Sequence, residues 1–199
     1  MGAVIDPIEE IVAERERARE KDDPNVNVCF LATVTSEGKP TVRGLSLRDI
    51  DHRGFGLLIS TLSKKWEQIH RASGYELLIY WATVRRQYRV RGHIAPMEEE
   101  LVQEYWDRKG HGSRLLEHYY PTFEHQSTPV PSYEHLLEGM EALRKRHPEG
   151  EEVPLPQVLK GIYLVPQQIE AWHGGRERLH LRRLYTRHGD EWTAQVLVP

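Results

Sequence analysis

The stretch VNVCFLATVTSEGKPTVRGLSLRDIDHRGFGLLIS, residues 26–60, decides the fold class. Two β-rich runs flank Thr35-Ser36-Glu37-Gly38-Lys39, a glycine-containing connector of hairpin length. A second turn, Asp51-His52-Arg53-Gly54, leads into a further strand over residues 55–60. The stretch therefore predicts an antiparallel meander.

Outward from this meander, the pattern continues as strands, then helices, then strands. Strands are predicted over residues 75–84, 87–95, 161–172, 179–187 and 192–198, and helices over residues 8–21, 63–72, 98–108 and 133–146, with Ser63 able to cap the second helix. Prolines mark the segment between the last two helices as an irregular loop. Many short antiparallel strands with few helices favour a mostly β, α+β protein built on a closed or nearly closed barrel.

Composition restricts the class of protein. The 199 residues suit one domain, and 39% hydrophobic with 29% charged residues describes a soluble globular chain. No run approaches the roughly 18 apolar residues of a membrane helix, and the N-terminus lacks the pattern of a secretory signal. A single cysteine, Cys29, lies in an apolar run and is expected in the core of a cytoplasmic protein. The net charge of −3 gives no general attraction to nucleic acid.

The segment Arg178-Leu179-His180-Leu181-Arg182 carries the most information about function. On a strand, Arg178, His180 and Arg182 would share one face. Three such cations repel each other unless water, acids or an anionic ligand screens them. A solvated outer face explains the pattern as well as a ligand does, but Trp172 and Gly174-Gly175 just upstream could border a planar cofactor.

Two further basic segments have both a functional and a structural interpretation. Ser63-Lys64-Lys65 at a predicted helix start favours a phosphate, although exposed lysine pairs are common. In the second, Arg85, Gln87, Arg89 and Arg91 would share one strand face, which is either solvated or, less favoured, bound to RNA.

Other nucleotide and metal sites are not indicated. His111, His118 and His125 are spaced too widely for a ligand pair on one helical turn, and Pro121 is expected to break any helix joining them. The chain has no G-x-G-x-x-G or Walker loop.

Taken together, the segments resemble the pyridoxamine 5'-phosphate oxidase family over nearly the whole chain. The family's flavin-lining strand is similar to Arg43-Gly44-Leu45-Ser46-Leu47-Arg48, and its Ser-Arg-Lys phosphate motif is similar to Ser63-Lys64-Lys65. Its Arg-Gln pair is matched by Arg86-Gln87, and its Gln-Ser step by Gln126-Ser127. The most specific motif, Trp followed by Gly and then Arg-Leu-His-x-Arg, is matched from Trp172 to Arg182.

The resemblance implies one FMN-binding split β-barrel domain over residues 1–199, with a helix in residues 1–24 and dimerisation and active-site strands in residues 161–199. It also implies a homodimer whose active sites are shared between two chains. It assigns the cofactor to Arg43, Gly44, Leu45, Ser46, Leu47, Arg48, Lys64, Lys65, Gln87, Gln126, Ser127, Trp172 and Arg182. It assigns the substrate to Arg48, Tyr105, Lys109, Ser113, Arg178 and His180, with Arg178 and His180 as the catalytic residues and no metal.

The departures from the family pattern concern the substrate more than the cofactor. Arg48 stands where the family has Lys, and Lys109 stands where it has Arg, two residues that are not interchangeable in a planar fork. Leu181 replaces an acidic residue between His180 and Arg182. The family's substrate-contacting segment before the first helix is expected to be missing, and the loop between Ser113 and Gln126 is longer than usual.

The function implied is an oxidase that converts pyridoxamine or pyridoxine 5'-phosphate to pyridoxal 5'-phosphate and reduces dioxygen to hydrogen peroxide. An FMN-dependent oxidase of the same family that acts on a phenazine precursor or another small aromatic amine is the first alternative. A non-catalytic binder of flavin, haem or pyridoxal phosphate is the second. Neither nucleic acid nor a membrane is an expected partner.

Overall fold

The structure, a computed structural model, describes residues 6–71, 74–175, 177 and 179–199. The chain forms two compact units, each described by itself below. Unit 1 is Met1–Leu57, Ala72–Ala95 and Ile162–Pro199, and unit 2 is Leu58–Arg71 and Pro96–Gly161. No helix in the described part of the chain is long and apolar enough to cross a membrane.

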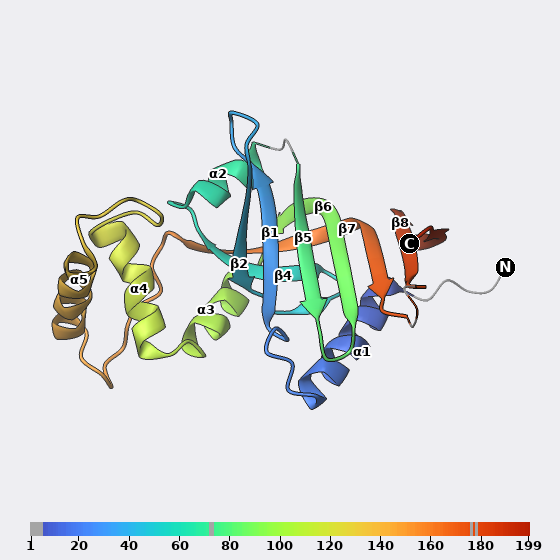
Figure 1. The fold of residues 1–199 in the computed structure, drawn as a ribbon. Coiled ribbons are helices and arrows are strands. Elements are labelled where there is room, and N and C mark those ends of the chain that lie inside the picture. The colour runs from blue at the N-terminus through green and yellow to red at the C-terminus, as the bar shows by residue number, and fades with distance from the viewer. Residues whose placement is uncertain (1–5, 72–73, 176, 178) are drawn as a thin grey trace. The chain divides into compact units, whose positions relative to one another are not determined.

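A curled antiparallel sheet forms most of unit 1 (Figure 1). Its strands are β1 Val28–Val34, β2 Pro40–Ser46, β3 Ile50–Asp51, β4 Gly54–Ser60, β5 Tyr75–Trp81, β6 Arg86–Pro96, β7 Leu159–His173, β8 Leu181–His188 and β9 Glu191–Leu197. They follow the order β2-β1-β5-β6-β7-β4-β3, and β8 pairs with both β7 and β9. The strands match the predicted ones closely, so the mostly β barrel architecture is confirmed.

The hairpin of β1 and β2 has the alternation that the sequence predicts. Cys29, Leu31 and Thr33 are buried, whereas the residues between them are half-buried. Leu31 pairs with Arg43 across the hairpin. Burial raises the pKa of the Cys29 thiol to about 12, which confirms this cysteine as an inert core residue.

Two glycines let neighbouring strands approach β7 closely. A Cβ atom at Gly92 would lie 1.8 Å from the carbonyl oxygen of Val165, and one at Gly54 would lie 2.3 Å from that of Leu164. Gly54 also has a φ of +126°, which other residues rarely adopt. Only glycine therefore fits where β6 and β4 flank β7.

Helix α1, Pro7–Glu20, begins at Asp6, whose side chain accepts a hydrogen bond from the backbone N–H of Ile8. Its buried residues include the apolar Ile8, Ile11 and Ala18, and also the charged Glu14 and Arg15. Arg15 donates to the carbonyl oxygens of Val26 and Leu47, and thereby ties the helix to the ends of the first hairpin.

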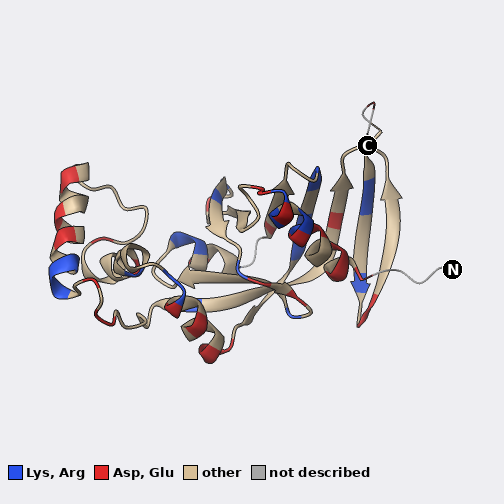
Figure 2. Cartoon of the chain, turned by 90° about the horizontal axis from the view of Figure 1, so that it is seen from below, with Lys and Arg blue, Asp and Glu red and all other residues tan. Residues whose placement is uncertain are grey.

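Unit 2 contains four helices in its described residues: α2 Lys64–His70, α3 Glu99–Asp107, α4 His111–Thr122 and α5 Tyr133–Arg146. Leu115, Tyr119 and Leu143 form its core with Trp106. Along α5 the acidic residues come first and the basic residues are clustered in the last turn (Figure 2), where they complement the helix dipole.

Helix α4 corrects the predicted irregular loop. His111 and His118 lie on one helix, and Pro121 lies inside its last turn. A proline removes one backbone hydrogen bond, but this loss near the helix end is outweighed by the burial of Leu115 and Tyr119. The irregular loop predicted over these residues was wrong, but the helix ends one residue after Pro121, so no helix joins His111 and His118 to His125.

Two strand boundaries and one helix cap also differ from prediction. Strand β8 begins at Leu181, so His180 precedes the strand, and Arg178 lies outside the described residues. Strand β6 begins at Arg86, and Arg85 lies in the preceding turn with a φ of +54°. Ser63 precedes α2, but its hydroxyl donates to the carbonyl oxygen of Ser60 and does not cap the helix.

Candidate functional site

The predicted site residues of unit 1 lie on or beside strands, and we call them the strand set. They are Arg43, Gly44, Leu45, Ser46, Leu47, Arg48, Gln87, Trp172, His180 and Arg182. Those of unit 2 lie on or beside helices, and we call them the helix set. They are Lys64, Lys65, Tyr105, Lys109, Ser113, Gln126 and Ser127.

Arg43 is fixed against the first hairpin. Its guanidinium donates to the carbonyl oxygen of Leu31 at 3.0 Å and to the hydroxyls of Thr33 and Thr41 at 2.6 and 2.5 Å. Partial burial lowers the pKa of this guanidinium. These bonds to uncharged groups orient the cation and leave its charge in place.

The rest of the predicted flavin-lining segment, residues 44–48, becomes more buried toward its end. Gly44 and Ser46 are exposed, Leu45 is half-buried and Leu47 is buried. Arg48 is half-buried, and its backbone N–H donates to the carbonyl oxygen of Gly56. Exposed and half-buried positions thus alternate along β2, and Gly44 and Ser46 lie on the face opposite Arg43.

An ion-pair ladder crosses the sheet next to the strand set. Arg89 donates to both oxygens of Glu76 at 2.6 and 3.3 Å, and Arg91 donates to the same carboxylate. Burial opposes ionisation of Glu76, but the hydrogen bonds from the two arginines outweigh it and lower the pKa of this carboxyl. The acids that screen these arginines support the solvated-face interpretation over RNA. Gln87 is half-buried on the same strand.

Arg182 is joined to this ladder through Glu170. Its Nε and Nη2 donate to Oε1 of Glu170 at 3.1 and 2.7 Å, and its Nη1 donates to the carbonyl oxygen of Val198 at 3.0 Å. The other oxygen of Glu170 accepts from Arg89 at 3.3 Å. Because three strands contribute to these contacts, the direction of the Arg182 guanidinium is set by the sheet.

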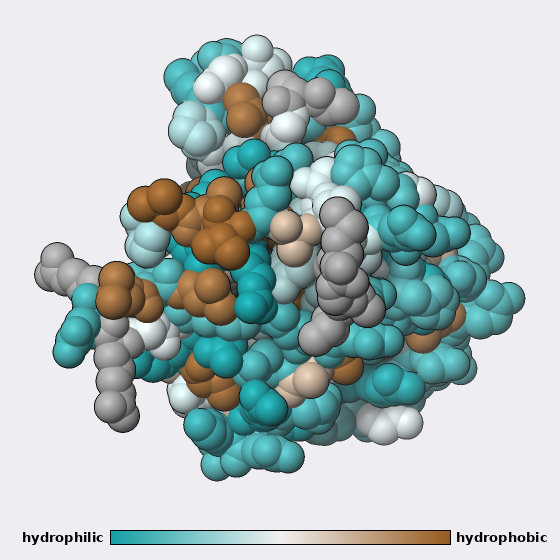
Figure 3. Space-filling view, turned by 90° about the vertical axis from the view of Figure 1, so that its right-hand side faces the viewer, coloured by the Kyte–Doolittle hydropathy of each residue, from teal (hydrophilic) through white to brown (hydrophobic). Residues whose placement is uncertain are grey.

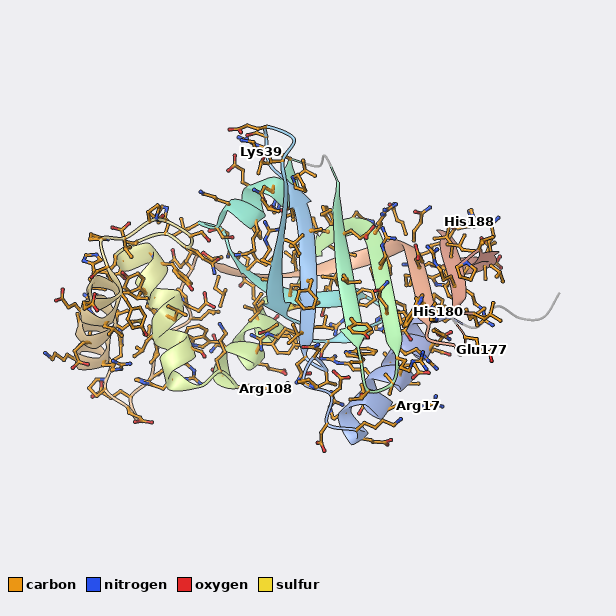
Figure 4. The ribbon with its side chains drawn as sticks, viewed as in Figure 1. Arg17, Lys39, Arg108, Glu177, His180 and His188 are labelled. Carbon is orange, nitrogen blue, oxygen red and sulfur yellow. The ribbon has the colours of Figure 1, made fainter. Side chains whose placement is uncertain are left out.

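His180 packs against Trp172 at the start of β8. The ring centroids are 4.8 Å apart with an interplanar angle of 47°. The backbone N–H of Gly175 donates to Nδ1 of His180 at 3.2 Å, so a neutral ring carries its proton on Nε2. Figure 4 shows His180 beside Glu177, in the turn between β7 and β8.

Arg85 holds this turn and does not belong to the strand face on which it was predicted. Its side chain donates to the carbonyl oxygen of Gly175 at 2.8 Å, and its own carbonyl oxygen accepts from the backbone of Gly174. A Cβ atom at Gly175 would lie 1.9 Å from the carbonyl oxygen of Leu179. The turn that presents His180 is therefore tight and tethered.

In the helix set, Lys65 and Gln126 meet although they are far apart in sequence. The ammonium of Lys65 donates to the amide oxygen of Gln126. Lys64 is exposed at the start of α2, and Ser127 is exposed with a φ of +67°. The structure thus joins the predicted phosphate motif to the predicted Gln-Ser step.

The predicted substrate residues of the helix set lie around the start of α4. Tyr105 is buried on α3, Lys109 is half-buried in the connection, and Ser113 is exposed on the first turn of α4. Nζ of Lys109 donates to Oε1 of Glu117 at 2.5 Å. An acid therefore already pairs with the cation that was expected to hold a substrate phosphate.

Sequence reasoning missed Glu117 and its neighbour Tyr120. Burial raises the pKa of the Tyr120 hydroxyl, the Glu117 charge adds to this, and a hydrogen bond with Gln126 opposes it. Glu117 follows Ser113 by four residues, so a helix predicted there would have placed the two side chains on one face. It missed Glu170 too, which only the register of β7 and β8 reveals.

The described residues include no group of three or more His, Cys, Asp or Glu side chains that could hold a metal ion. They do include donors that fit FMN. Arg43, Lys65 and Arg182 offer N–H donors and positive charge suited to a phosphate. Trp172 offers an aromatic face beside a tethered turn.

Comparisons with known proteins place this chain among relatives. A family model described as pyridoxamine 5'-phosphate oxidase matches residues 17–140. A second, described as pyridoxine 5'-phosphate oxidase C-terminal dimerisation region, matches residues 160–199. A pyridoxine/pyridoxamine 5'-phosphate oxidase of Rubrobacter xylanophilus is 34% identical over 100% of this chain and 89% of its own length.

Solved structures share the fold. PhzG from Burkholderia lata 383, in complex with tetrahydrophenazine-1-carboxylic acid, has a TM-score of 0.82 and 26% identity, covering 98% of this chain and 93% of its own. A pyridoxamine 5'-phosphate oxidase-related, FMN binding protein from Nostoc punctiforme has a TM-score of 0.75 and 19% identity, covering 98% and 100%. The chain therefore belongs to the pyridoxamine 5'-phosphate oxidase family of FMN-dependent oxidases.

Proposed function

We propose that this protein binds FMN and oxidises pyridoxine and pyridoxamine 5'-phosphates to pyridoxal 5'-phosphate. The observation that carries this proposal is the residue set itself, in which Lys65 meets Gln126, Arg182 is oriented by Glu170, and His180 packs on Trp172. The relative that matches over the full length of this chain supports the vitamer as substrate.

In this proposal the cofactor is held by Arg43, Gly44, Leu45, Ser46, Leu47, Arg48, Lys64, Lys65, Gln87, Gln126, Ser127, Trp172 and Arg182. FMN, when bound, supplies the hydride acceptor, from which dioxygen takes the electrons to give hydrogen peroxide. The oriented guanidiniums of Arg43 and Arg182 give charge-assisted hydrogen bonds to an anion without losing side-chain freedom on binding.

The substrate in this proposal is held by Arg48, Tyr105, Lys109, Ser113, Arg178 and His180. His180 presents a proton on Nε2, because Gly175 occupies Nδ1, and can donate a hydrogen bond to a substrate oxygen. The tether from Arg85 to Gly175 keeps this donor in place.

A homodimer is part of the proposal. The outer strand β9 is exposed on both faces, and Val196 and Val198 are 73% and 86% exposed. Figure 3 shows hydrophobic side chains gathered on the face that carries the C-terminal strands. An exposed apolar patch within a segment that matches a dimerisation region suits contact with a second copy.

A second candidate is an oxidase of the same family that acts on a carboxylated or other small aromatic amine. The Lys109–Glu117 pair favours it, because the pair offers a phosphate less net charge than a lysine alone. The likeness to PhzG, whose complex holds a tricyclic carboxylic acid, supports it further.

The test is hydrogen peroxide release by FMN-loaded protein with pyridoxine 5'-phosphate, pyridoxamine 5'-phosphate and a tricyclic aromatic amine. Turnover of the vitamers that is lost in Arg178→Ala and His180→Ala is the expected result. His188→Ala is the control, since His188 is exposed at the far end of β8.

Turnover of the tricyclic amine alone would favour the second candidate. A protein that purifies without flavin absorbance and cannot be reconstituted with FMN would exclude both oxidases and leave a binding protein. A haem absorption band in the purified protein would identify haem as that ligand.

A further inference from the structure

The ammonium of Lys109 already has a carboxylate partner in a place that is largely removed from water. The side chains of Lys109 and Glu117 are only 11% and 19% exposed, and Nζ lies 2.5 Å from Oε1. Water screens such a pair less than an ion pair on the surface. The charge of Lys109 is therefore compensated within the chain.

The surroundings of this pair restrict where an anion can approach. Nζ of Lys109 lies 5.7 Å from the centre of the Trp106 ring, which covers one side of the ammonium. The guanidinium of Arg114 lies 5.9 Å from the same ring, and its Nε donates to the carbonyl oxygen of Lys109. Ser113 and Glu117 share one face of α4, so an anion bound to Lys109 and Ser113 meets the Glu117 carboxylate.

Charge decides which anions can bind there. A phosphate monoester carries about −1.5 to −2 charges near neutral pH. If the phosphate binds Lys109 in place of Glu117, the mostly buried Glu117 carboxylate loses its partner, which costs free energy. If Glu117 keeps Lys109, the phosphate is repelled. A carboxylate with a single charge, or an uncharged group, meets a smaller penalty.

We infer that Glu117 is a specificity-determining residue that competes with a substrate phosphate for Lys109. The enzyme consequently binds phosphorylated vitamers less tightly than Tyr105, Lys109 and Ser113 alone would allow. Compared with a site that lacks Glu117, it also discriminates less against aromatic substrates that carry a carboxylate or no anionic group. This inference rests on the proposed function, since that is what assigns Lys109 to the substrate.

The experiment compares the FMN-loaded wild type with Glu117→Gln, which keeps the size of the side chain and removes its charge. The probes are 4-deoxypyridoxine 5'-phosphate and 4-deoxypyridoxine, which have no oxidisable group at the reacting carbon and differ only in the phosphate. Isothermal titration calorimetry measures both dissociation constants. For the phosphate, Glu117→Gln should lower the constant roughly tenfold, the ratio that corresponds to one charge-assisted hydrogen bond. For the unphosphorylated probe, it should change by less than about twofold.

Glu104→Gln is the matched control. Glu104 pairs with Arg108 on α3, and both side chains are more than half exposed, so the variant removes the same charge from a solvated pair. It should change either constant by less than about twofold, since exposed pairs contribute little. Glu117→Ala serves as a second variant should Glu117→Gln fail to fold.

Unchanged or weaker binding of the phosphate by the Glu117 variants would overturn the inference, because Glu117 would then support Lys109 in holding the phosphate. Equal tightening by Glu104→Gln would also overturn it, since general charge would be the cause. The binding measurement does not require turnover. A protein that binds the phosphate more tightly without Glu117 but oxidises no vitamer would sustain this inference and refute the proposed function.

Discussion

Arg182 in the strand set and Lys109 in the helix set are both paired with a carboxylate, but the two pairs are built differently. Arg182 makes one hydrogen bond from each of its three guanidinium nitrogens, two toward Glu170 and one toward Val198, while each terminal nitrogen has a second N–H. Glu170 is shared with Arg89. Lys109 makes one contact with Glu117, which lies on the neighbouring helix.

The difference follows from the chemistry of the two cations. A guanidinium is a planar fork whose direction can be fixed by several partners, whereas an ammonium is a point charge on a flexible stem. Arg182 is thus suited to a ligand that every catalytic cycle keeps in one place, such as a cofactor. Lys109 is suited to a partner that is exchanged, such as a substrate.

The largest expected effect is a loss of stability when a buried side chain is removed from α4, the helix that carries Ser113 of the helix set. Leu115 is fully buried between α4 and the rest of the unit 2 core. Leu115→Ala should lower the free energy of unfolding by about 2–5 kcal/mol, because a cavity replaces a buried side chain. Urea denaturation followed by tryptophan fluorescence measures this loss.

The neighbouring Leu116 is the control for this prediction. Leu116 is 37% exposed on the same helix, and Leu116→Ala should change the free energy of unfolding by no more than about 0.5–1 kcal/mol. Similar losses in the two variants would mean that burial of Leu115 does not hold α4 in place.

A smaller effect is expected from Arg182→Lys in the strand set. Lysine cannot contact Glu170, Val198 and a ligand with one planar group, so the dissociation constant of FMN should rise roughly tenfold. Quenching of FMN fluorescence on titration with apoprotein measures it. Arg187→Lys on the same strand is the control, since Arg187 contacts the turn at Gly189. If FMN binds Arg182→Lys as tightly as wild type, the fixed guanidinium is not needed for the cofactor.

The sequence predicted the strands and the helices α2, α3 and α5 to within a few residues, but it missed α4. Alternation with period two is local, and it placed the first hairpin and the last three strands to within a few residues. Helix α4 was missed because Pro121 argued against a helix, whereas the burial that stabilises it involves Leu143 on α5. Tertiary packing of this kind is not visible in local sequence.

The same limit explains the acids that the sequence did not reveal. Glu170 meets Arg182 because β7 and β8 pair with a particular register, in which Trp172 is opposite Arg182. Glu117 meets Lys109 only once α3 and α4 have folded. Motif spacing finds the candidate cations, but the carboxylates that pair with them lie on elements whose positions are set by the fold.

The smallest expected effect concerns the dependence of stability on pH that the carboxyl of Glu10 contributes. Nε2 of His173 lies 2.8 Å from Oε1 of Glu10, beside Trp172 in the strand set, and Tyr185 donates to Oε2 of Glu10 at 3.2 Å. The nearby imidazole of His173 is the main cause that lowers the pKa of the Glu10 carboxyl below its ordinary value of 4.5. The ionised carboxylate is therefore favoured in the folded protein.

A lowered carboxyl pKa contributes stability that is present above the unfolded value and is lost as pH falls through the folded value. The wild type should therefore lose more unfolding free energy between about pH 5 and pH 3 than Glu10→Gln, which has no charge to lose. The control is Glu9→Gln, an exposed neighbour on α1, whose pH profile should follow that of the wild type. Urea midpoints measured at each pH give the profiles.

Since Glu10 is partly exposed, solvent screening keeps this difference below the two effects described above. Parallel profiles for wild type and Glu10→Gln would show that His173 holds the start of α1 by packing alone. The electrostatic contacts of the strand set would then not extend to Glu10.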